Sequence, residues 1–309
     1  MIPNREEGPS PTEVLAAKTL VDERLAAQFG STGDLVSHAA HVALTSPGKR
    51  LRPLMVILGA ADLGADFDAA VDVGCALELV HAASLVLDDL PCMDDADTRR
   101  GAPAVHRAFG EDVAVLASIA LIARAFKTLT TLRGVTPEAR ARLATILADA
   151  MGVDGLVGGQ LDDLRGDRAD ETGACSVMER KTAALFVAAL EMACVLAEGD
   201  GACRQALLRI GREIGLAFQI LDDLLDLEGA AVGKPVGQDD GKPNLVRLIG
   251  AQAGRARYVR HVESALVGLA SLPGGAPRLS GLLQRAFADA LAPAGAGTTA
   301  RVAAAAAAP

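Results

Sequence analysis

Two clusters of aspartate residues lie inside the most apolar stretches of this chain, and they constrain its fold and chemistry more than any other feature. The first follows the apolar run SLVL and contains Asp88, Asp89, Asp94 and Asp95; the second lies in FQILDDLLDLEG. Carboxylates in apolar surroundings are costly to desolvate, and neighbouring like charges oppose each other's ionisation. A hard cation removes both penalties, and the Arg-Arg-Gly that follows the first cluster suits phosphate oxygens. The clusters therefore predict a site where Mg²⁺ holds a polyphosphate.

The pattern of apolar residues predicts an all-α fold. Half of the 309 residues are hydrophobic, and Trp is absent. Ala, Leu and Val dominate, which favours packed helices. Apolar periodicity predicts a helix from about Thr12, two more carrying Leu35 and Leu51, and further helices over the segments 70–90, 111–132, 137–150, 176–198, 203–226, 244–270 and 278–291. Pro91 should end the fourth of these helices, and no alternation typical of strands has a useful length.

The chain divides into one large region and two short ends. Residues 1–11 are polar and Pro-rich, and we expect a disordered lead-in there. Residues 292–309 form an Ala/Gly-rich tail that we also expect to be disordered. No linker separates two kinds of composition between them, so we expect a single all-α domain over residues 12–291, built around a deep central cavity.

Charge and cysteine usage exclude several classes of protein. With 39 acidic and 30 basic residues the formal net charge is −9, so non-specific nucleic-acid binding is not expected. The five cysteines form no CxxC pair, which argues against a zinc site or a disulfide framework and fits a reducing cytoplasm. The polar N-terminus is no signal peptide, and the longest apolar run, Val113 to Ala123, is too short to span a bilayer. We expect a cytoplasmic protein without stable membrane insertion, although a greasy substrate could bring it to a membrane surface.

Each aspartate cluster could have a purely structural explanation, but this explanation accounts less well for the first cluster. On a helix, Asp222 and Asp226 share a face with Asp223 beside them, which could be the acidic stripe of an amphipathic helix. Asp88 and Asp89, by contrast, fall near the C-terminal end of a helix, where the dipole disfavours anions. Two such clusters together favour a functional site.

Basic and polar residues accompany the clusters at regular spacing. Lys49, Arg50 and Arg52 lie at a turn before an apolar helix, where backbone N–H groups can also face an anion. His81 precedes Asp88 by two helical turns. Lys181 and Thr182 open another apolar run, and Gln219 precedes Asp223 by one turn. Each residue alone is unremarkable, so the prediction depends on their combination.

These residues form motifs that resemble those of the trans-prenyltransferases, the short-chain isoprenyl diphosphate synthases. From about Pro47 to Gly250 the motifs occur in the family's order: PGKRLRP, ELVHAASLVLDDLPCMDDADTRRG, GLVGGQLDDL, RKTAALF, GLAFQILDDLLDLEG and GKPVGQDDGKPNLV. The segment VHAASLVLDDLPCMDDA is most similar to bacterial geranylgeranyl diphosphate synthases. Two positions depart from the family pattern: Pro235 stands where many members carry Asp, and Pro243-Asn244 replaces a Ser/Thr pair.

The resemblance implies a role for each matching residue. It implies Mg²⁺ ligands at Asp88, Asp89, Asp94, Asp222, Asp223 and Asp226, with several ions bridging the diphosphate of an allylic substrate. It implies diphosphate contacts from Arg99, Lys181, Gln219 and Lys234. It implies a pocket for isopentenyl diphosphate made by Lys49, Arg52, His81 and Arg100. The catalytic set implied in this way is Asp88, Asp89, Asp94, Arg99, Lys181, Thr182, Gln219, Asp222 and Asp223.

The resemblance also implies a product and a partner. In the family the product grows down a tunnel beside the helix of the first cluster, where Ala83 and Ser84 are both small. We therefore expect the twenty-carbon geranylgeranyl diphosphate, with the fifteen-carbon farnesyl diphosphate as the alternative. A homodimer is expected by resemblance.

Three other classes of protein remain open from the sequence. A non-catalytic partner subunit of a heteromeric synthase would be favoured by loss of one cluster, and both are intact. Terpene cyclases lack the paired basic anchors KR-x-RP and RRG that this chain carries. A structural helical protein leaves the arginines and the placement of His81 unexplained.

Overall fold

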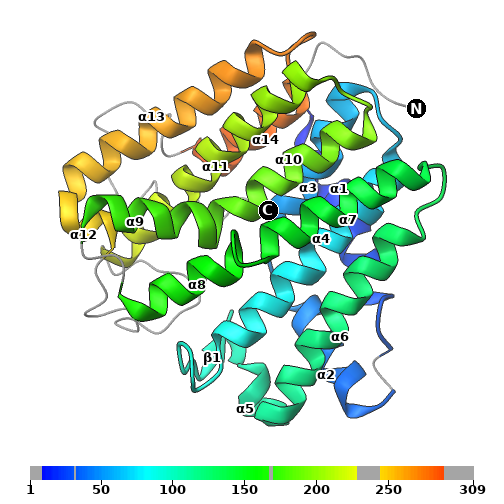
Figure 1. Cartoon of the computed structure of the whole chain (residues 1–309), viewed down its shortest axis with the longest axis vertical. Helices are drawn as coiled ribbons and strands as arrows, with labels where there is room; N and C mark the ends of the chain where they lie inside the picture. The colour runs from blue at the N-terminus through cyan, green and yellow to red at the C-terminus, as the bar shows by residue number, and fades with distance from the viewer. Residues whose placement is uncertain (1–8, 31–32, 167–169, 228–243, 289–309) are drawn as a thin grey trace.

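The computed structural model describes residues 9–30, 33–166, 170–227 and 244–288, and these are almost entirely helical (Figure 1). The elements are α1 (Pro11–Ala26), α2 (Leu35–Thr45), α3 (Leu51–Leu63), α4 (Phe67–Asp88), β1 (Thr98–Arg99), β2 (Ala102–Pro103), α5 (Val105–Phe109), α6 (Glu111–Thr130), α7 (Pro137–Met151), α8 (Leu156–Arg165), α9 (Glu171–Val177), the π-helix η1 (Met178–Ala183), α10 (Ala184–Leu196), α11 (Gly201–Leu227), α12 (Leu245–Ile249), α13 (Ala251–Ala270) and α14 (Pro277–Ala286). The predicted all-α fold class is confirmed.

Local sequence signals begin several of these helices. Ser10 and Glu13 form a reciprocal capping box at the start of α1, where the Ser10 N–H donates to Glu13 Oε2 at 2.6 Å. Asp34, Asp66 and Thr136 accept from backbone N–H groups at the starts of α2, α4 and α7. These caps satisfy donors that helix geometry leaves without a partner.

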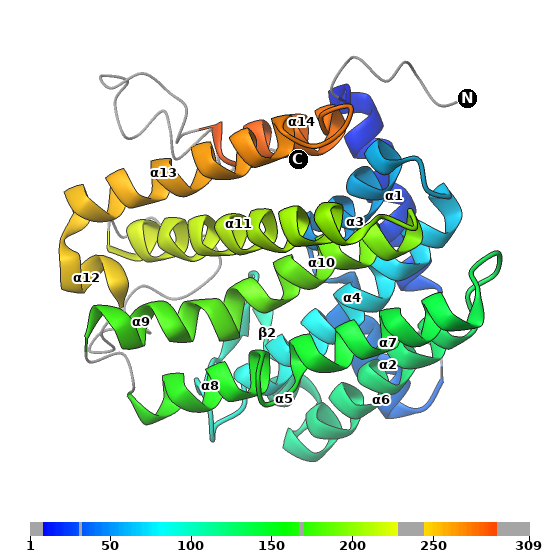
Figure 2. The ribbon, with the colours of Figure 1, turned by 45° about the horizontal axis from the view of Figure 1, so that its top comes forward.

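The helices stack in layers around α4. In Figure 2, α13 and α14 form one outer edge and α6, α7 and α8 the other, with α3, α4, α10 and α11 between them. The central helix α4 packs against α3, α6 and α10, and its residues from Ala69 to Val86 supply much of the apolar core. The helices that carry the two aspartate clusters are thus held inside one packed bundle.

Two glycines allow α11 to approach its neighbours closely. A Cβ on Gly211 would lie 2.7 Å from the Cα of Val187 in α10, and one on Gly215 would lie 2.4 Å from the Cα of Ala183 in η1. No side chain fits at these distances, so glycine is required at both positions. The close contact fixes the register of α11 against η1. It therefore also fixes the position of the second aspartate cluster relative to η1.

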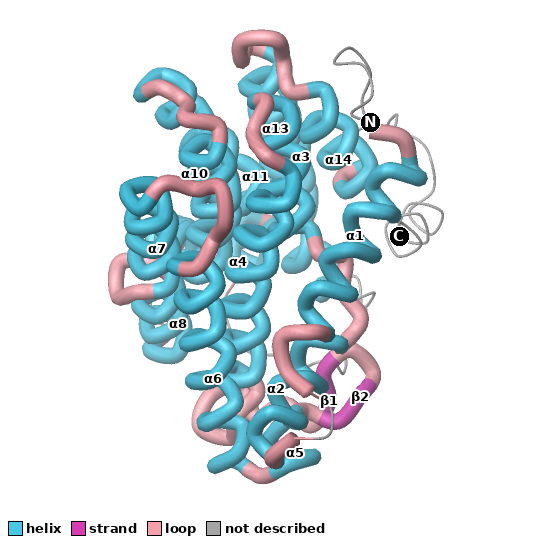
Figure 3. Tube along the Cα trace, turned by 90° about the vertical axis from the view of Figure 1, so that its right-hand side faces the viewer, coloured by secondary structure: helices cyan, strands magenta, loops and turns pink. Residues whose placement is uncertain are grey.

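Several predicted boundaries differ from the structure. The helix expected over residues 176–198 is α9, η1 and α10 in succession, with a π-helical turn at its centre. The helix expected over 244–270 is split into α12 and α13 by Gly250, whose φ of 86° ends α12. A two-residue hairpin, β1 with β2, is formed by the segment after the first cluster and lies at the same end of the molecule as α2 and α5 (Figure 3). The helix before Pro91 ends at Asp88, as predicted.

Among the described residues, the two helices α4 and α6 are long and apolar enough to cross a membrane by length and composition alone, which the short run in the sequence did not suggest. Most of α4 is buried inside the bundle, as befits a core helix, whereas α6 has less than half of its most apolar window buried. The expected tail, nearly all of the expected lead-in, and the Gly/Pro loop 229–243 with Lys234 and Pro235 lie outside the described residues.

Candidate active site

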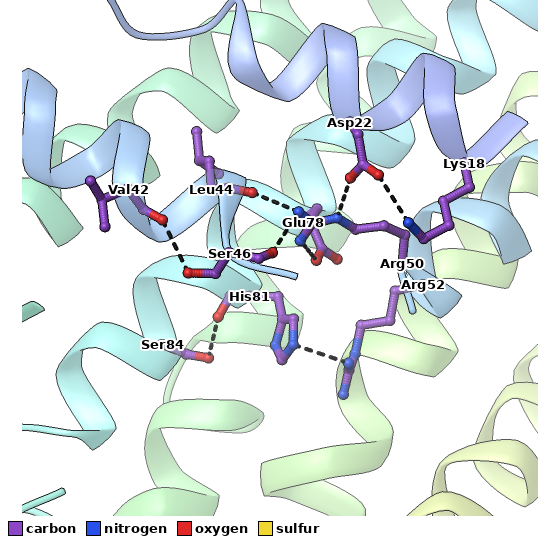
Figure 4. Close-up of polar contacts among 10 residues, drawn as sticks. All are labelled: Lys18, Asp22, Val42, Leu44, Ser46, Arg50, Arg52, Glu78, His81 and Ser84. Atoms are coloured by element: carbon purple, nitrogen blue, oxygen red, sulfur yellow. Dashed lines mark hydrogen bonds and ion pairs between the residues drawn. The ribbon is translucent and has the colours of Figure 1, made fainter. Parts of the chain in front are cut away.

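Arg50 and the turn before α3 form the first support of the site. Arg50 has a φ of 48° and immediately precedes α3. Its guanidinium is buried and donates to Glu78 Oε1 at 2.9 Å, to Asp22 Oδ1 at 2.7 Å and to the Leu44 carbonyl at 2.6 Å (Figure 4). These hydrogen bonds tie α1 and α4 to the start of α3. They also hold the turn that presents Lys49 and Arg52.

Arg52 lies two residues further on and has a different environment. Its guanidinium carbon is 4.3 Å from the ring centroid of Phe186 and 5.7 Å from that of Phe218. Burial lowers the pKa of Arg52 to about 10, while the charges of Glu78 and Asp222 oppose this shift. The group therefore stays charged at neutral pH, stacked on aromatic faces, which is a favourable arrangement for a buried cation.

His81 is the polar partner of Arg52. Its Nε2 is 3.3 Å from Arg52 Nη1, so the imidazole accepts a hydrogen bond there (Figure 4). Burial and the nearby charges of Arg52 and Arg100 hold the pKa of His81 well below its usual value. The ring is neutral at physiological pH and leaves the positive charge of the pocket on the arginines.

The first aspartate cluster bends around the end of α4. The Asp94 N–H donates to the Asp88 carbonyl at 2.9 Å, which folds the chain back past Pro91. Burial, with Asp94 and Asp89, raises the pKa of Asp88 to about 6, although Lys181 and Arg99 act to lower it. Asp94, Lys181 and Arg99 therefore all lie close enough to Asp88 to influence its charge.

Asp89, unlike Asp88, forms hydrogen bonds to an arginine of the hairpin that follows α4. Its carboxylate is buried and accepts from the Arg99 guanidinium, with Nε at 3.0 Å from Oδ1 and 3.1 Å from Oδ2. This ion pair fixes the β1–β2 hairpin on the end of α4. The Arg100 guanidinium, next in the hairpin, packs against Gly48, where a Cβ would lie 2.8 Å from Nη1. The hairpin therefore brings Arg100 to the turn that carries Lys49, whose side chain is exposed.

The second cluster is tied to η1 by a chain of hydrogen bonds. The Thr182 hydroxyl donates to Gln219 Oε1 at 2.7 Å, and Gln219 Nε2 donates to Asp223 Oδ1 at 2.9 Å. Asp223 is buried while Asp222 is exposed, and Asp226 pairs with Arg247 of α12 at 3.4 Å. The network joins the predicted residues Thr182, Gln219 and Asp223.

Lys181 is positioned by α8, which sequence reasoning did not include in the site. Its Nζ donates to Asp163 Oδ2 at 2.5 Å, and the Asp163 side chain is almost fully buried. A Cβ on Gly159 would lie 2.3 Å from the Lys181 nitrogen, so α8 touches the π-helical backbone directly. Gln160, also buried, has no hydrogen-bond partner for its amide among the described residues. The motif GLVGGQLDDL contains these residues. Its glycines could have predicted the close approach of α8 to the π-helix, and its acid could have predicted the partner of Lys181.

The product-length residues lie on α4 as expected. Ala83 is almost fully buried, and Ser84 is partly buried with its hydroxyl donating to the His81 carbonyl at 2.9 Å.

The oxygen-rich donors of the two clusters fit a magnesium ion. Among the described residues no three acidic, histidine or cysteine side chains converge on one point. Mg²⁺ in phosphate-transferring sites commonly takes one or two carboxylates and completes its shell with substrate phosphate and water. Asp88, whose pKa is raised to about 6 by burial and neighbouring carboxylates, is the kind of group that a divalent cation stabilises.

Comparison with known families agrees with this arrangement. The family model described as polyprenyl synthetase matches residues 34–263. Over 236 residues the chain is 43% identical to a geranylgeranyl diphosphate synthase of Pantoea ananas, covering 75% of this chain and 78% of that protein. Over 237 residues it is 39% identical to a farnesyl diphosphate synthase of Bacillus subtilis, covering 73% and 80%.

Solved structures share the same architecture. An FPP/GFPP synthase from Zymomonas mobilis superimposes with a TM-score of 0.80 at 34% identity, covering 88% of this chain and 96% of that one. A geranyltransferase from Helicobacter pylori, solved with magnesium and isoprenyl diphosphate, has a TM-score of 0.80 at 26% identity, covering 90% and 96%. With the family model matching well over half of its length, the chain belongs to the polyprenyl synthetase family.

Proposed function

We propose that this chain condenses isopentenyl diphosphate with allylic diphosphates, head to tail and in trans, to give geranylgeranyl diphosphate and free diphosphate. The enzyme class, prenyltransferase, follows from the family. The observation that carries the proposal is a set of four cations. Arg99 and Lys181 lie near carboxylates of the first cluster. Arg52 and Arg100 lie near each other and near His81. Such a site suits two diphosphates in one pocket.

The allylic diphosphate is assigned to the region between the two clusters. Lys181 and Arg99 lie close enough to Asp88 to shift its pKa, so both cations border the space where this diphosphate would lie. Mg²⁺, held by carboxylates of the set Asp88, Asp89, Asp94, Asp222, Asp223 and Asp226, would neutralise the charge that builds on the departing diphosphate. Preplaced cations stabilise that charge without reorganisation.

Isopentenyl diphosphate is assigned to the turn before α3. Arg52 and Arg100 provide charge there, His81 accepts from Arg52, and Lys49 lies next to the glycine that contacts Arg100. The double bond of this substrate attacks the allylic carbon, and the departing diphosphate can take the proton that is lost. The apolar walls provided by Phe186 and Phe218 help to exclude water that would quench the cation.

The length of the product is the finer part of the proposal. Ala83 is a small, almost fully buried residue of α4 about one turn before Asp88, and its small side chain supports a twenty-carbon product. Relatives named for geranylgeranyl and for farnesyl diphosphate synthesis are both similar to this chain. Farnesyl diphosphate is therefore the second candidate product of the same chemistry.

We further propose a cytoplasmic homodimer whose catalytic domain extends over residues 12–291. The exposed face of α6 carries Val115, Leu116 and Ile119, each more than a third exposed. The exposed acids of its first turn, Glu111 and Asp112, lie at the opposite end from the exposed Lys127. An antiparallel second copy would bury the apolar residues and place those acids beside the lysine, so charge complementarity favours a twofold contact.

Turnover assays with single variants test the proposed site. We expect rapid diphosphate release with Mg²⁺, its abolition by EDTA, and a loss of roughly 100-fold or more in Asp88→Asn and Asp222→Asn. Asp95→Asn is the matched control, because Asp95 is exposed, pairs with Arg107 at 3.0 Å and has a φ of 48° that Asn tolerates. Equal activity in all three variants would contradict the assignment.

A further inference from the structure

The turn between α10 and α11 brings together two cysteines that the proposed reaction does not use. The Gly199 N–H donates to the Cys194 carbonyl at 2.9 Å, which closes the end of α10. Asp200 caps the next helix, accepting from the Cys203 N–H at 2.7 Å. The turn is thus hydrogen-bonded on both sides, and it fixes the two cysteine backbones relative to each other.

The two sulfur atoms face the same point. A Cβ built on Gly199 would lie 2.6 Å from Cys194 Sγ and 3.4 Å from Cys203 Sγ. Both residues are free thiols, and Cys203 is close enough to Cys194 to raise its pKa. The pair is therefore preorganised for a bond between the sulfur atoms, although it lacks the CxxC spacing that usually signals one.

The two thiols differ in exposure. Cys194 is 2% exposed, whereas Cys203 is only partly buried. Burial and the neighbouring Cys203 raise the pKa of Cys194 to about 12, so its S–H remains protonated. Solvent oxidants can therefore reach Cys203 first, with the Cys194 sulfur next to it as the second thiol.

We propose that Cys194 and Cys203 form a modification site that hydroperoxides convert to a disulfide. The sulfur of Cys203 attacks one peroxide oxygen, the O–O bond breaks, and a sulfenic acid and one water form when hydrogen peroxide is the oxidant. The sulfur of Cys194 then attacks the sulfenic sulfur; the S–O bond breaks, and the hydroxide leaves as a second water with the Cys194 proton. In sum, two thiols and one hydrogen peroxide give one disulfide and two waters.

The disulfide would reinforce the hairpin of α10 and α11 without reaching the candidate active site. Arg204, adjacent to Cys203, already pairs with Glu191 across the same two helices at 2.5 Å. From Cys203 to Asp222 the rise along α11 is about 28 Å. We therefore expect the oxidised protein to keep its catalytic activity and to unfold at a higher temperature.

The test uses the full-length, fully reduced protein. After treatment with hydrogen peroxide, remaining thiols are blocked with iodoacetamide and the protein is digested without reduction for mass spectrometry. We expect a peptide pair linked through Cys194 and Cys203 with two hydrogens lost, and an upward shift in Tm of roughly 5 °C that dithiothreitol reverses.

Two variants separate this site from general oxidation. Cys203→Ser should give no linked peptide and no rise in Tm, while Cys92→Ser, which removes the exposed cysteine near the first cluster, should behave as the parent protein. The proposal would be overturned if Cys203 were found as a sulfinic acid while Cys194 remained a free thiol that iodoacetamide alkylates. A fully reduced pair at peroxide doses that oxidise Cys92 would also overturn it.

Discussion

At the scale of single residues, neighbouring positions of the same type have different tasks. Arg50 donates to Asp22, Glu78 and the backbone carbonyls of Leu44 and Ser46, while Arg52 stacks on Phe186 and contacts His81. The charge pattern alone predicts a basic turn, and only the family resemblance separates Arg52 from Arg50, because the αL backbone at Arg50 that turns it inward follows from packing across α1, α3 and α4.

The neutral state of His81 predicts a pH-dependent stability. Its pKa is lowered in the folded protein by burial and by Arg52 and Arg100. Below about pH 6.5 the unfolded chain binds a proton that the folded chain does not, so the free energy of unfolding falls as the pH drops. We expect this group to cost up to about 1.4 kcal/mol by pH 5.5, and less where solvent reaches the ring.

Urea unfolding at pH 7.5 and 5.5 measures this difference. The His81→Gln variant should lose less stability than the parent between the two pH values. His38→Gln changes an exposed histidine and should keep the parent's slope. Identical slopes for the parent and His81→Gln would show that His81 titrates normally.

Asp163 is predicted to position Lys181. Replacing it by Asn removes the charge that holds Nζ at 2.5 Å, so Lys181 loses its orientation beside Asp88. We expect kcat/KM for the allylic diphosphate to fall roughly 10- to 100-fold, with a larger rise in KM for this substrate than for isopentenyl diphosphate. Asp162→Asn, which breaks only the 2.6 Å pair with Arg180, is the matched control. Equal kinetics in the two variants would refute the positioning role.

At the scale of elements, the sequence predicts helices well and their irregularities poorly. The ends of α4 and α7 follow from caps and prolines that any local rule detects. The π-helical turn η1 leaves no such signal, since it arises where α8 and α11 press on the same backbone through Gly159 and Gly215. The motif therefore predicts that Lys181 and Thr182 belong to the site, but no local signal predicts the π-helical turn that carries them.

The face of α4 below Asp88 is predicted to limit chain growth. Ala83→Phe or Ala83→Tyr adds a ring where the native side chain is almost fully buried, and it should shorten the product from twenty to fifteen carbons or fewer. The Ala83→Ser variant keeps the volume small and should keep the product. Analysis of dephosphorylated products by gas chromatography compares the three proteins, and unchanged chain length in the aromatic variants would reject the tunnel assignment.

The exposed apolar face of α6 is predicted to be the dimer contact. Leu116→Glu should convert dimers to monomers in light scattering coupled to size exclusion, because it places a charge in the centre of that face. Val267 on α13 is an equally apolar but isolated exposed residue, so Val267→Glu should leave the dimer intact. A Leu116→Glu protein that remains dimeric would move the interface elsewhere.

At the scale of the whole molecule, the proposed site draws on segments that lie far apart in the chain. Arg52, Asp88, Lys181 and Asp222 come from α3, α4, η1 and α11, and each influences at least one of the others electrostatically. Residue types and motif order predict which groups participate. Some of their partners, such as Arg99 for Asp89, depend on helix packing and could not be predicted from one sequence.

The most direct test of the account is to identify the product of the purified protein. The protein is incubated with Mg²⁺, isopentenyl diphosphate and, in separate reactions, dimethylallyl, geranyl or farnesyl diphosphate, and the released alcohols are analysed after phosphatase treatment. The account predicts geranylgeraniol as the main alcohol, and none when EDTA is present. Formation of no prenyl alcohol longer than the starter in any reaction would contradict it.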